Sequence, residues 1–337
     1  SGEENMANLD ISTNMPTKNG LMGIMLQTRG GADRLSTDIS WKINREQAYE
    51  GNIGIAAMFR RDSDKGLYTD VDIAESTLTF NDSTWIVNPA KVTVSPRHEV
   101  KVSGLNVHRS NQYVKIEGSV SDNPWDLLTL DLRNFSLDYL FESLGIDKVM
   151  LGGDATGTFY ASRLLSPEPR LETPGLNVKG ISYNKVVLGD ADVRSRWEPE
   201  PRGITLDATI DSDEGRRSLV NGAIYPMNES LDLTFTADRV KVGFMQPYME
   251  AFASDISGYA RLWGTFKYID LEGDVFADDL RLKVNFTNTY YTATDSVHFR
   301  PGLIDLNGIR IKDSEGHTAN LNGWVRHKFF KEPRFEF

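Results

Sequence analysis

The sequence predicts an all-β protein: an elongated, curved antiparallel sheet with a few short helices. Three observations lead to this prediction. Short segments alternate apolar with polar residues, turn sequences separate them, and a unit of about 100 residues returns along the chain. Repeated units that grow along one dimension offer an extended surface rather than a single catalytic pocket.

The alternation is clearest in segments 129–133 and 281–286, where leucine, valine or phenylalanine takes every second position. Successive side chains on a strand point to opposite faces, so each segment has one apolar and one polar face. Turn sequences rich in Asp, Ser, Asn and Gly, such as 211–215 and 312–316, connect these segments. Short connections between amphipathic strands favour an antiparallel meander.

The repeat centres on Gly118, Gly222 and Gly323, each inside an amphipathic strand and 104 residues (118 to 222) and 101 residues (222 to 323) apart. We divide the chain accordingly. Residues 1–20 are a polar linker or disordered start, 21–112 a first β-repeat region, 113–217 a second β-repeat unit, 218–318 a third, and 319–337 the start of a truncated further unit.

Two short helices are predicted, over 136–144 and 242–253. Ser136 is a suitable N-cap for the first, and the second carries an apolar stripe that includes Phe244 and Phe252. We expect these helices to cover a sheet edge or the end of a core. A mobile lid or a membrane-touching helix is the alternative.

The composition excludes several classes of function. The 37 basic and 48 acidic residues give a net charge of −11, which disfavours nucleic acid as a partner, because its phosphates require a basic surface. The absence of cysteine excludes disulfides and thiolate metal sites. No segment approaches the roughly 20 apolar residues that span a bilayer. We interpret the chain as a fragment of a longer protein.

No motif predicts catalysis, a metal or a cofactor. The five histidines lack metal-ligand spacing, and neither a nucleophile elbow nor a phosphate-binding loop is present. A carbohydrate hydrolase on a β scaffold is the enzymatic alternative, because Trp85, Trp125, Trp197, Trp263 and Trp324 could stack on sugars. Burial in a core is the other explanation for these tryptophans, and we predict that the protein is not an enzyme.

The apolar side of such a sheet must be covered or filled. It can pack on a second sheet as a sandwich, or it can form a gutter whose apolar floor binds another apolar body such as acyl chains. The absence of a clear linker between repeats favours the gutter. The predicted floor residues, which could equally line an ordinary dry core, are Val114, Ile116, Leu128, Leu130, Leu132, Leu231, Leu233, Phe235, Leu282, Val284, Phe286, Ile309 and Ile311.

Segment 255–266 resembles the glycine-containing units of the TamB family, in the AsmA-like superfamily. The stretch 295–330 is similar to one found in TamB-like proteins of Bacteroidetes-type bacteria. Its matching positions are Asp313, Gly316, Ala319, Gly323, His327 and Phe330. The likeness extends over residues 50–337, its motifs are degenerate, and the family's C-terminal hallmark region is not matched.

The resemblance implies a periplasmic part of an inner-membrane-anchored envelope protein, with the anchor outside this chain. It also implies a curved sheet with an apolar groove, called a β-taco, and no catalytic residues. The expected partners are a phospholipid or other acyl-chain ligand and an outer-membrane barrel protein of the assembly module. The expected roles are phospholipid transport between the membranes and support of outer-membrane protein assembly. The alternative is a lipid-free β-sandwich scaffold that recognises an outer-membrane client by strand addition.

Overall fold

The fold comes from a computed structural model, which divides into two compact units that we treat separately. Unit 1 comprises Ser1–Phe135 and Gly157–Leu171, and unit 2 comprises Ser136–Thr156 and Glu172–Phe337. The described residues are 7–17, 20–43, 49–63, 66–80, 83–138, 151–241, 251–252, 255–284, 289–329 and 331–336.

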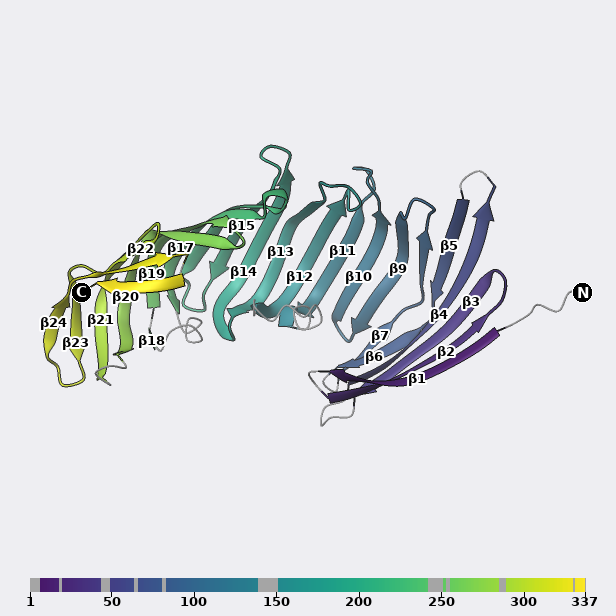
Figure 1. The fold of residues 1–337 in the computed structure, drawn as a ribbon, viewed down its shortest axis with the longest axis horizontal. Coiled ribbons are helices and arrows are strands. Elements are labelled where there is room, and N and C mark those ends of the chain that lie inside the picture. The colour runs from purple at the N-terminus through teal and green to yellow at the C-terminus, as the bar shows by residue number, and fades with distance from the viewer. Residues whose placement is uncertain are drawn as a thin grey trace, which may run out of the picture. The chain divides into compact units, whose positions relative to one another are not determined.

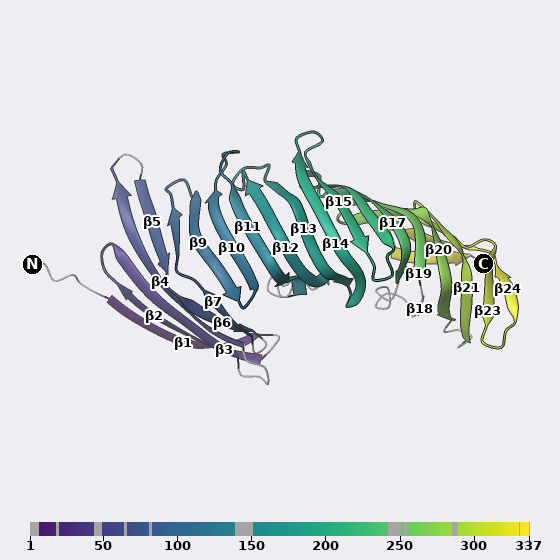
Figure 2. The same ribbon diagram turned by 180° about the vertical axis from the view of Figure 1, so that it is seen from behind.

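The predicted all-β fold, built from an antiparallel sheet, is confirmed (Figures 1 and 2). The strands before the unit boundary are β1 (Ala7–Thr17), β2 (Gly20–Gly30), β3 (Arg34–Ile43), β4 (Tyr49–Asp62), β5 (Gly66–Ile73), β6 (Ser76–Phe80), β7 (Ser83–Val87), β8 (Ala90–Val94), β9 (Val100–Arg109), β10 (Gln112–Val120) and β11 (Leu128–Ser136). Strand β12 (Leu151–Ser162) contributes residues to both units.

The later strands belong to unit 2, apart from the first residues of β13. They are β13 (Arg170–Tyr183), β14 (Val186–Glu198), β15 (Gly203–Asp211), β16 (Arg217–Tyr225), β17 (Ser230–Lys241), β18 (Ala251–Phe252), β19 (Asp255–Thr265), β20 (Tyr268–Val284), β21 (Thr289–Arg300), β22 (Leu303–Asp305), β23 (Ile309–Asp313), β24 (Thr318–Leu321), β25 (Trp324–Lys328) and β26 (Lys331–Glu336). A 3-10 turn, η1 (Pro226–Asn228), lies between β16 and β17.

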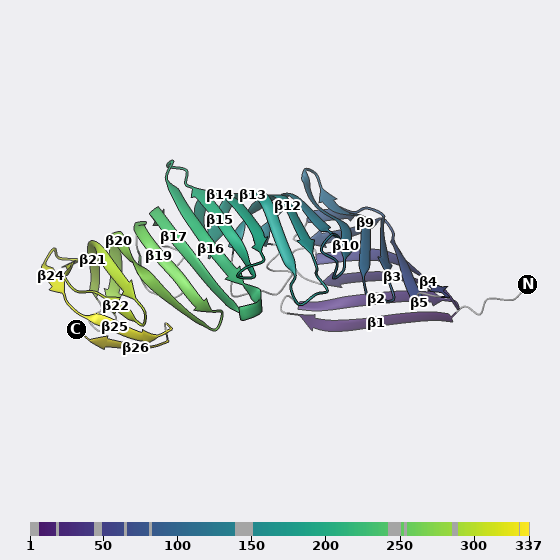
Figure 3. The ribbon, with the colours of Figure 1, turned by 90° about the horizontal axis from the view of Figure 1, so that it is seen from above.

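In unit 1 the strands form a meander whose middle members are broken. Strand β4 pairs with both β5 and β6, and β9 pairs with both β8 and β7. Hence β5 and β6 together form one strand of the sheet that is interrupted at Ala74 and Glu75. In the same way, β7 and β8 form one strand that is interrupted at Asn88 and Pro89. Breaks at matching points of neighbouring strands let the sheet bend, and in Figure 3 β1 to β3 run across the direction of β9 and β10.

Unit 2 also contains broken strands that let its sheet bend. The pairing runs from β13 in chain order to β17, then through β19, β20 and β21. Strand β21 pairs with both β22 and β23, which continue to β25 and β24 respectively. Bulges interrupt β17 near Arg239 and β20 near Asp279, both in the left-handed region with φ of 52° and 48°. Bulges of this kind increase bending and twist.

The repeat glycines take two different roles. Gly222 lies inside β16 with φ of 142°, and a Cβ there would collide with the carbonyl oxygen of Asp232 on β17. Gly118, inside β10 with φ of 118°, is equally close to the carbonyl of Leu127. Gly323 instead lies in the break between β24 and β25. The predicted pivot inside a strand is thus found at the first two glycines.

Two expectations about local structure differ from the fold, and a third agrees with it where the chain is described. Residues 1–20 are not simply a linker, because Ala7–Thr17 form β1, paired along its length with β2. In the predicted helix 242–253, Ala251 and Phe252 form β18, because their backbones pair with Leu282 and Arg281 of β20, and the rest lies outside the described residues. In the predicted helix 136–144, Leu137 and Asp138 are helical and 139–144 lie outside the described residues.

The glycine requirement is testable by Gly222→Ala. We expect it to lower the free energy of unfolding by about 1–3 kcal/mol, because alanine would be strained at this φ and would push β17 away. The matched control is Gly175→Ala in β13, where an added Cβ meets no atom within 4 Å and the change should stay within about 1 kcal/mol. Urea denaturation measures both. Equal effects of the two substitutions would contradict the assignment.

Two tryptophans of unit 1 lie in different surroundings, one in the core and the other on the surface. Trp85 is 3% exposed, with its ring 5.9 Å from that of Phe135, whereas Trp125 is 88% exposed. Trp85→Ala should destabilise the fold by about 3–5 kcal/mol through the cavity it leaves. Trp125→Ala should change stability by less than about 0.5 kcal/mol. Thermal unfolding of the two variants compares them directly.

Candidate functional site: the apolar face of the sheet

In unit 1 the strand register brings the predicted floor residues to one face. Val114 of β10 lies opposite Leu132 of β11, and Ile116 lies opposite Leu130. Leu128 lies opposite Gly118, where no side chain competes for space. These residues and their partners on neighbouring strands define what we call the apolar face of unit 1.

This face extends over strands that the sequence analysis did not single out. Two cross-strand rows show the extension: Ile11, Leu26, Ile39 and Ile53 across β1 to β4, and Ala57, Val71, Val92 and Val102 across β4, β5, β8 and β9. The same alternation could have revealed them. It is weaker there because serine, threonine and glycine share the apolar positions with aliphatic residues.

Unit 2 has an apolar face of its own. Leu231, Leu233 and Phe235 of β17 lie side by side on it, opposite Ile224, Gly222 and Val220 of β16 and opposite Gly264, Leu262 and Ala260 of β19. The predicted strand 231–235 therefore has the expected orientation, with aliphatic neighbours on the same face.

The remaining predicted floor residues lie further along unit 2. Ile309 and Ile311 of β23 lie opposite Leu321 and Ala319 of β24. The backbones of Leu282 and Val284 pair with those of Tyr291 and Thr289, and nothing further is described for the two side chains. Phe286 lies outside the described residues.

Exposure shows that the apolar faces are not sealed. Leu132 and Ile309 are buried, each 5% exposed, but the other predicted floor residues with described side chains are only half-buried. At the β1 end of the face, Leu9 and Ile11 are 54% and 46% exposed. Two stacked sheets would bury their inner faces against each other. Within the described ranges, the apolar faces therefore combine buried stretches, around Trp85 in unit 1 and around Val178 and Trp197 in unit 2, with apolar surface that stays open.

The opposite face is polar and held by ion pairs across strands. In unit 2, Arg261 of β19 donates from Nε and Nη2 to both carboxylate oxygens of Asp232 on β17, at 2.7 and 2.6 Å. The hydrogen bonds from this guanidinium lower the pKa of the Asp232 carboxyl. Bidentate pairing of this kind fixes geometry as well as charge. At β17 and β19 the two faces of the sheet therefore differ in chemistry, although Tyr259 and Trp263 are exposed on the ion-paired face.

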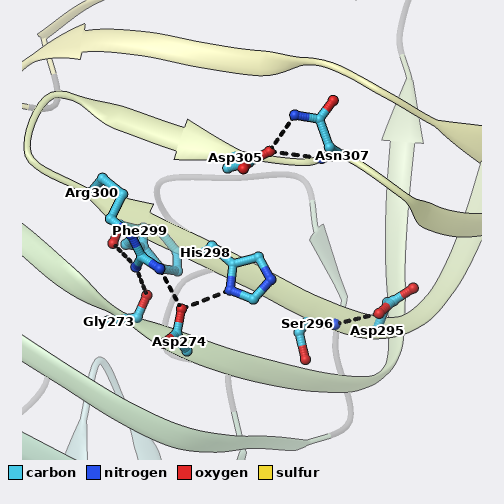
Figure 4. A network of polar contacts seen from close by, with 9 residues as sticks. All are labelled: Gly273, Asp274, Asp295, Ser296, His298, Phe299, Arg300, Asp305 and Asn307. Atoms are coloured by element: carbon cyan, nitrogen blue, oxygen red, sulfur yellow. Dashed lines mark hydrogen bonds and ion pairs between the residues drawn. The ribbon is translucent and has the colours of Figure 1, made fainter.

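A second polar cluster lies on β20, β21 and β22 (Figure 4). The Asp274 carboxylate interacts with Nδ1 of His298 at 2.7 Å and with Nη2 of Arg300 at 3.1 Å. His298 first, and Arg300 second, lower the pKa of Asp274. Asp305 on β22 accepts hydrogen bonds from the backbone and side chain of Asn307, which hold the break between β22 and β23.

A hollow of the described surface in unit 1 lacks the carboxylate pair that glycoside hydrolysis would need. This hollow, about 590 Å³, lies across β1 to β4 and β6 and is lined mainly by polar side chains of the polar face. Its Glu50 pairs with Lys42 at 2.8 Å, and no second carboxylate lines it. Glycoside hydrolysis requires two opposed carboxyl groups. Nor do three or more metal-ligating side chains gather anywhere in the part of the chain that the structure describes.

Comparison with known proteins identifies no relative: no family model, curated protein or solved structure matches the chain. Among the described residues, no helix is both long and apolar enough to cross a membrane.

The polar face predicts acid sensitivity. The folded-state pKa of Asp232 lies below its unfolded value of about 3.9, so the pair stabilises the fold above that pH and the contribution is lost as pH falls through the folded pKa. We expect the melting temperature to fall less steeply below about pH 4 in Asp232→Asn than in the parent chain. Asp207→Asn, on the same face of β15, is the control and should follow the parent.

Proposed function

We propose that this chain is a non-enzymatic segment of an envelope protein whose apolar sheet face carries or shields lipid acyl chains. One observation carries the proposal: in each unit, aliphatic side chains follow one another from strand to strand on one face and remain partly open to solvent. A soluble protein rarely leaves a continuous apolar surface uncovered without a partner.

An acyl chain suits this surface chemically. Binding would come from removing methylene groups from water, about 0.8 kcal/mol for each one fully buried. It needs no directional contact, so a degenerate repeat can supply it. The ion-paired polar face would stay in water, and a lipid headgroup would remain at the open border of the apolar face. This account requires no cofactor and no catalytic residue.

The wider role rests on the resemblance to TamB-like proteins. We infer a periplasmic segment of an inner-membrane-anchored protein that moves phospholipid between the membranes and supports assembly of outer-membrane proteins. Its partners would be phospholipid and an outer-membrane barrel protein. The open apolar face supports the lipid-handling part of this inference, and the barrel partner rests on the resemblance alone.

The lipid proposal predicts that charge on the apolar face abolishes lipid binding. Leu233→Glu places a carboxylate among Leu262 and neighbouring aliphatic side chains, where an acyl chain would have to desolvate it. We expect bound phospholipid, measured by native mass spectrometry of the purified chain and by titration with a fluorescent phospholipid, to fall at least about tenfold.

Asn221→Glu is the matched control, because Asn221 is exposed on the polar face of the adjacent strand β16. It should bind lipid like the parent chain. Circular dichroism of each variant checks that the sheet is intact. Full lipid binding by a folded Leu233→Glu chain would refute the proposal and leave a scaffold that recognises a client by strand addition as the better account.

A further inference from the structure

Three large aromatic side chains are exposed on the polar face of unit 2. They are Tyr259 and Trp263 of β19 and Phe276 of β20, which are 48%, 37% and 44% exposed. They share one face, because Trp263 lies opposite Asp232 of the ion pair, and Phe276 lies opposite Ser257, two residues from Tyr259. We call Tyr259, Trp263 and Phe276 the aromatic row. Core packing does not account for this row, since each side chain stays open to solvent.

Strand geometry sets the spacing within the aromatic row. Tyr259 and Trp263 are four residues apart on one strand, which separates them by about 13 Å. Phe276 is a diagonal neighbour of Tyr259 across the β19–β20 pair, at about 7 Å. The row therefore extends over about 20 Å of the sheet surface. A row of this length suits an elongated ligand better than a single small molecule.

A fixed hydrogen-bonding group lies within the row. Arg261 lies between Tyr259 and Trp263 on the same face of β19, and its guanidinium carbon is 5.9 Å from the centre of the Trp263 ring. The two hydrogen bonds that it donates to Asp232 hold the guanidinium in place. A ligand that lies along the row would therefore meet ring faces and a fixed polar group in turn.

The charged side chains beside the row leave no excess of positive charge. They are of both signs and lie paired or directly opposite one another across strands: Asp232, Arg261, Glu272, Asp274, His298 and Arg300. Three of these are carboxylates and two are arginines, and the cluster around Asp274 lies beside Tyr259 (Figure 4). A phosphate-bearing ligand would find no unmatched cation here, so the row favours a neutral ligand.

We propose that the aromatic row binds a neutral, linear, β-linked polysaccharide. The C–H groups on the faces of a sugar ring carry partial positive charge and stack on the negatively charged faces of aromatic rings. The hydroxyl groups at the rim of the sugar would exchange hydrogen bonds with the charged groups beside the row. A β-linked chain is extended and presents its ring faces along a nearly straight line, as the row does, whereas an α-linked chain coils away from a flat surface.

A lipid bilayer fits the row less well than a sugar does. Ion-paired side chains such as Arg261 and Asp232 lie on the same face as the rings, and insertion into a bilayer would remove their water. The row also lies on the face opposite Leu231, Leu233 and the other proposed acyl-chain contacts. The sugar proposal therefore goes beyond the proposed function and does not rest on it.

Isothermal titration calorimetry with chitohexaose, a soluble β-linked oligosaccharide, tests the proposal. The whole chain should bind chitohexaose and bind the α-linked maltohexaose far less. Trp263→Ala and Tyr259→Ala should each weaken binding at least about tenfold, because each removes a stacking ring. Trp263→Phe keeps a ring and should retain most of the affinity. The matched control is Trp125→Ala, which removes a tryptophan that is 88% exposed in unit 1 and should bind like the parent.

Circular dichroism of each variant checks that the sheet is intact. Leu233→Glu, altered on the opposite face, should bind chitohexaose like the parent, so failure of the lipid proposal and failure of the sugar proposal are distinguishable. No binding of chitohexaose, full binding by folded Trp263→Ala and Tyr259→Ala, or an equal loss in Trp125→Ala would each overturn the proposal. Loss of self-association by Trp263→Ala in sedimentation equilibrium, with sugar binding unchanged, would also overturn it and assign the row to a second copy of the chain.

Discussion

The fold depends on how long antiparallel strands bend without leaving backbone hydrogen-bonding groups unpaired. At each bend the ladder is interrupted and an N–H group loses its usual partner. A side chain from the adjacent strand replaces that partner. Glu117 accepts the N–H of Gly104 at 2.7 Å, and Asp190 accepts that of Gly180 at 2.8 Å.

The same arrangement recurs with hydroxyl acceptors in unit 2. Ser257 accepts the N–H of Arg239 at 2.9 Å, and Thr294 accepts that of Asp279 at 3.1 Å. Each acceptor lies on the strand next to the bulge, so neighbouring strands share each bend. Curvature is therefore distributed over several strands rather than concentrated at a single hinge.

This curvature explains why one sheet can have an apolar face without a second sheet packed on it. Near β7 to β9 the bend brings Trp85, Val87 and Val102 into a small core. Away from that core many aliphatic side chains stay half-buried, although Val178 and Ile309 of unit 2 are buried, and cross-strand ion pairs line the other face. Surface of this kind suits a ligand bound by burial alone.

Period-two alternation predicted the all-β class, strands such as 129–133, and the common face of residues such as Leu231, Leu233 and Phe235, because side-chain direction on a strand follows from local geometry. Whether that face is sealed or open could not be read locally, since burial depends on strands far apart in sequence, as the buried Leu132 and the half-buried Leu130 show. Strand β1 was not predicted, because only its pairing with β2 shows that its apolar residues lie on the apolar face. The contact between Tyr268 and Phe329 likewise exists only because the sheet brings two distant hairpins together.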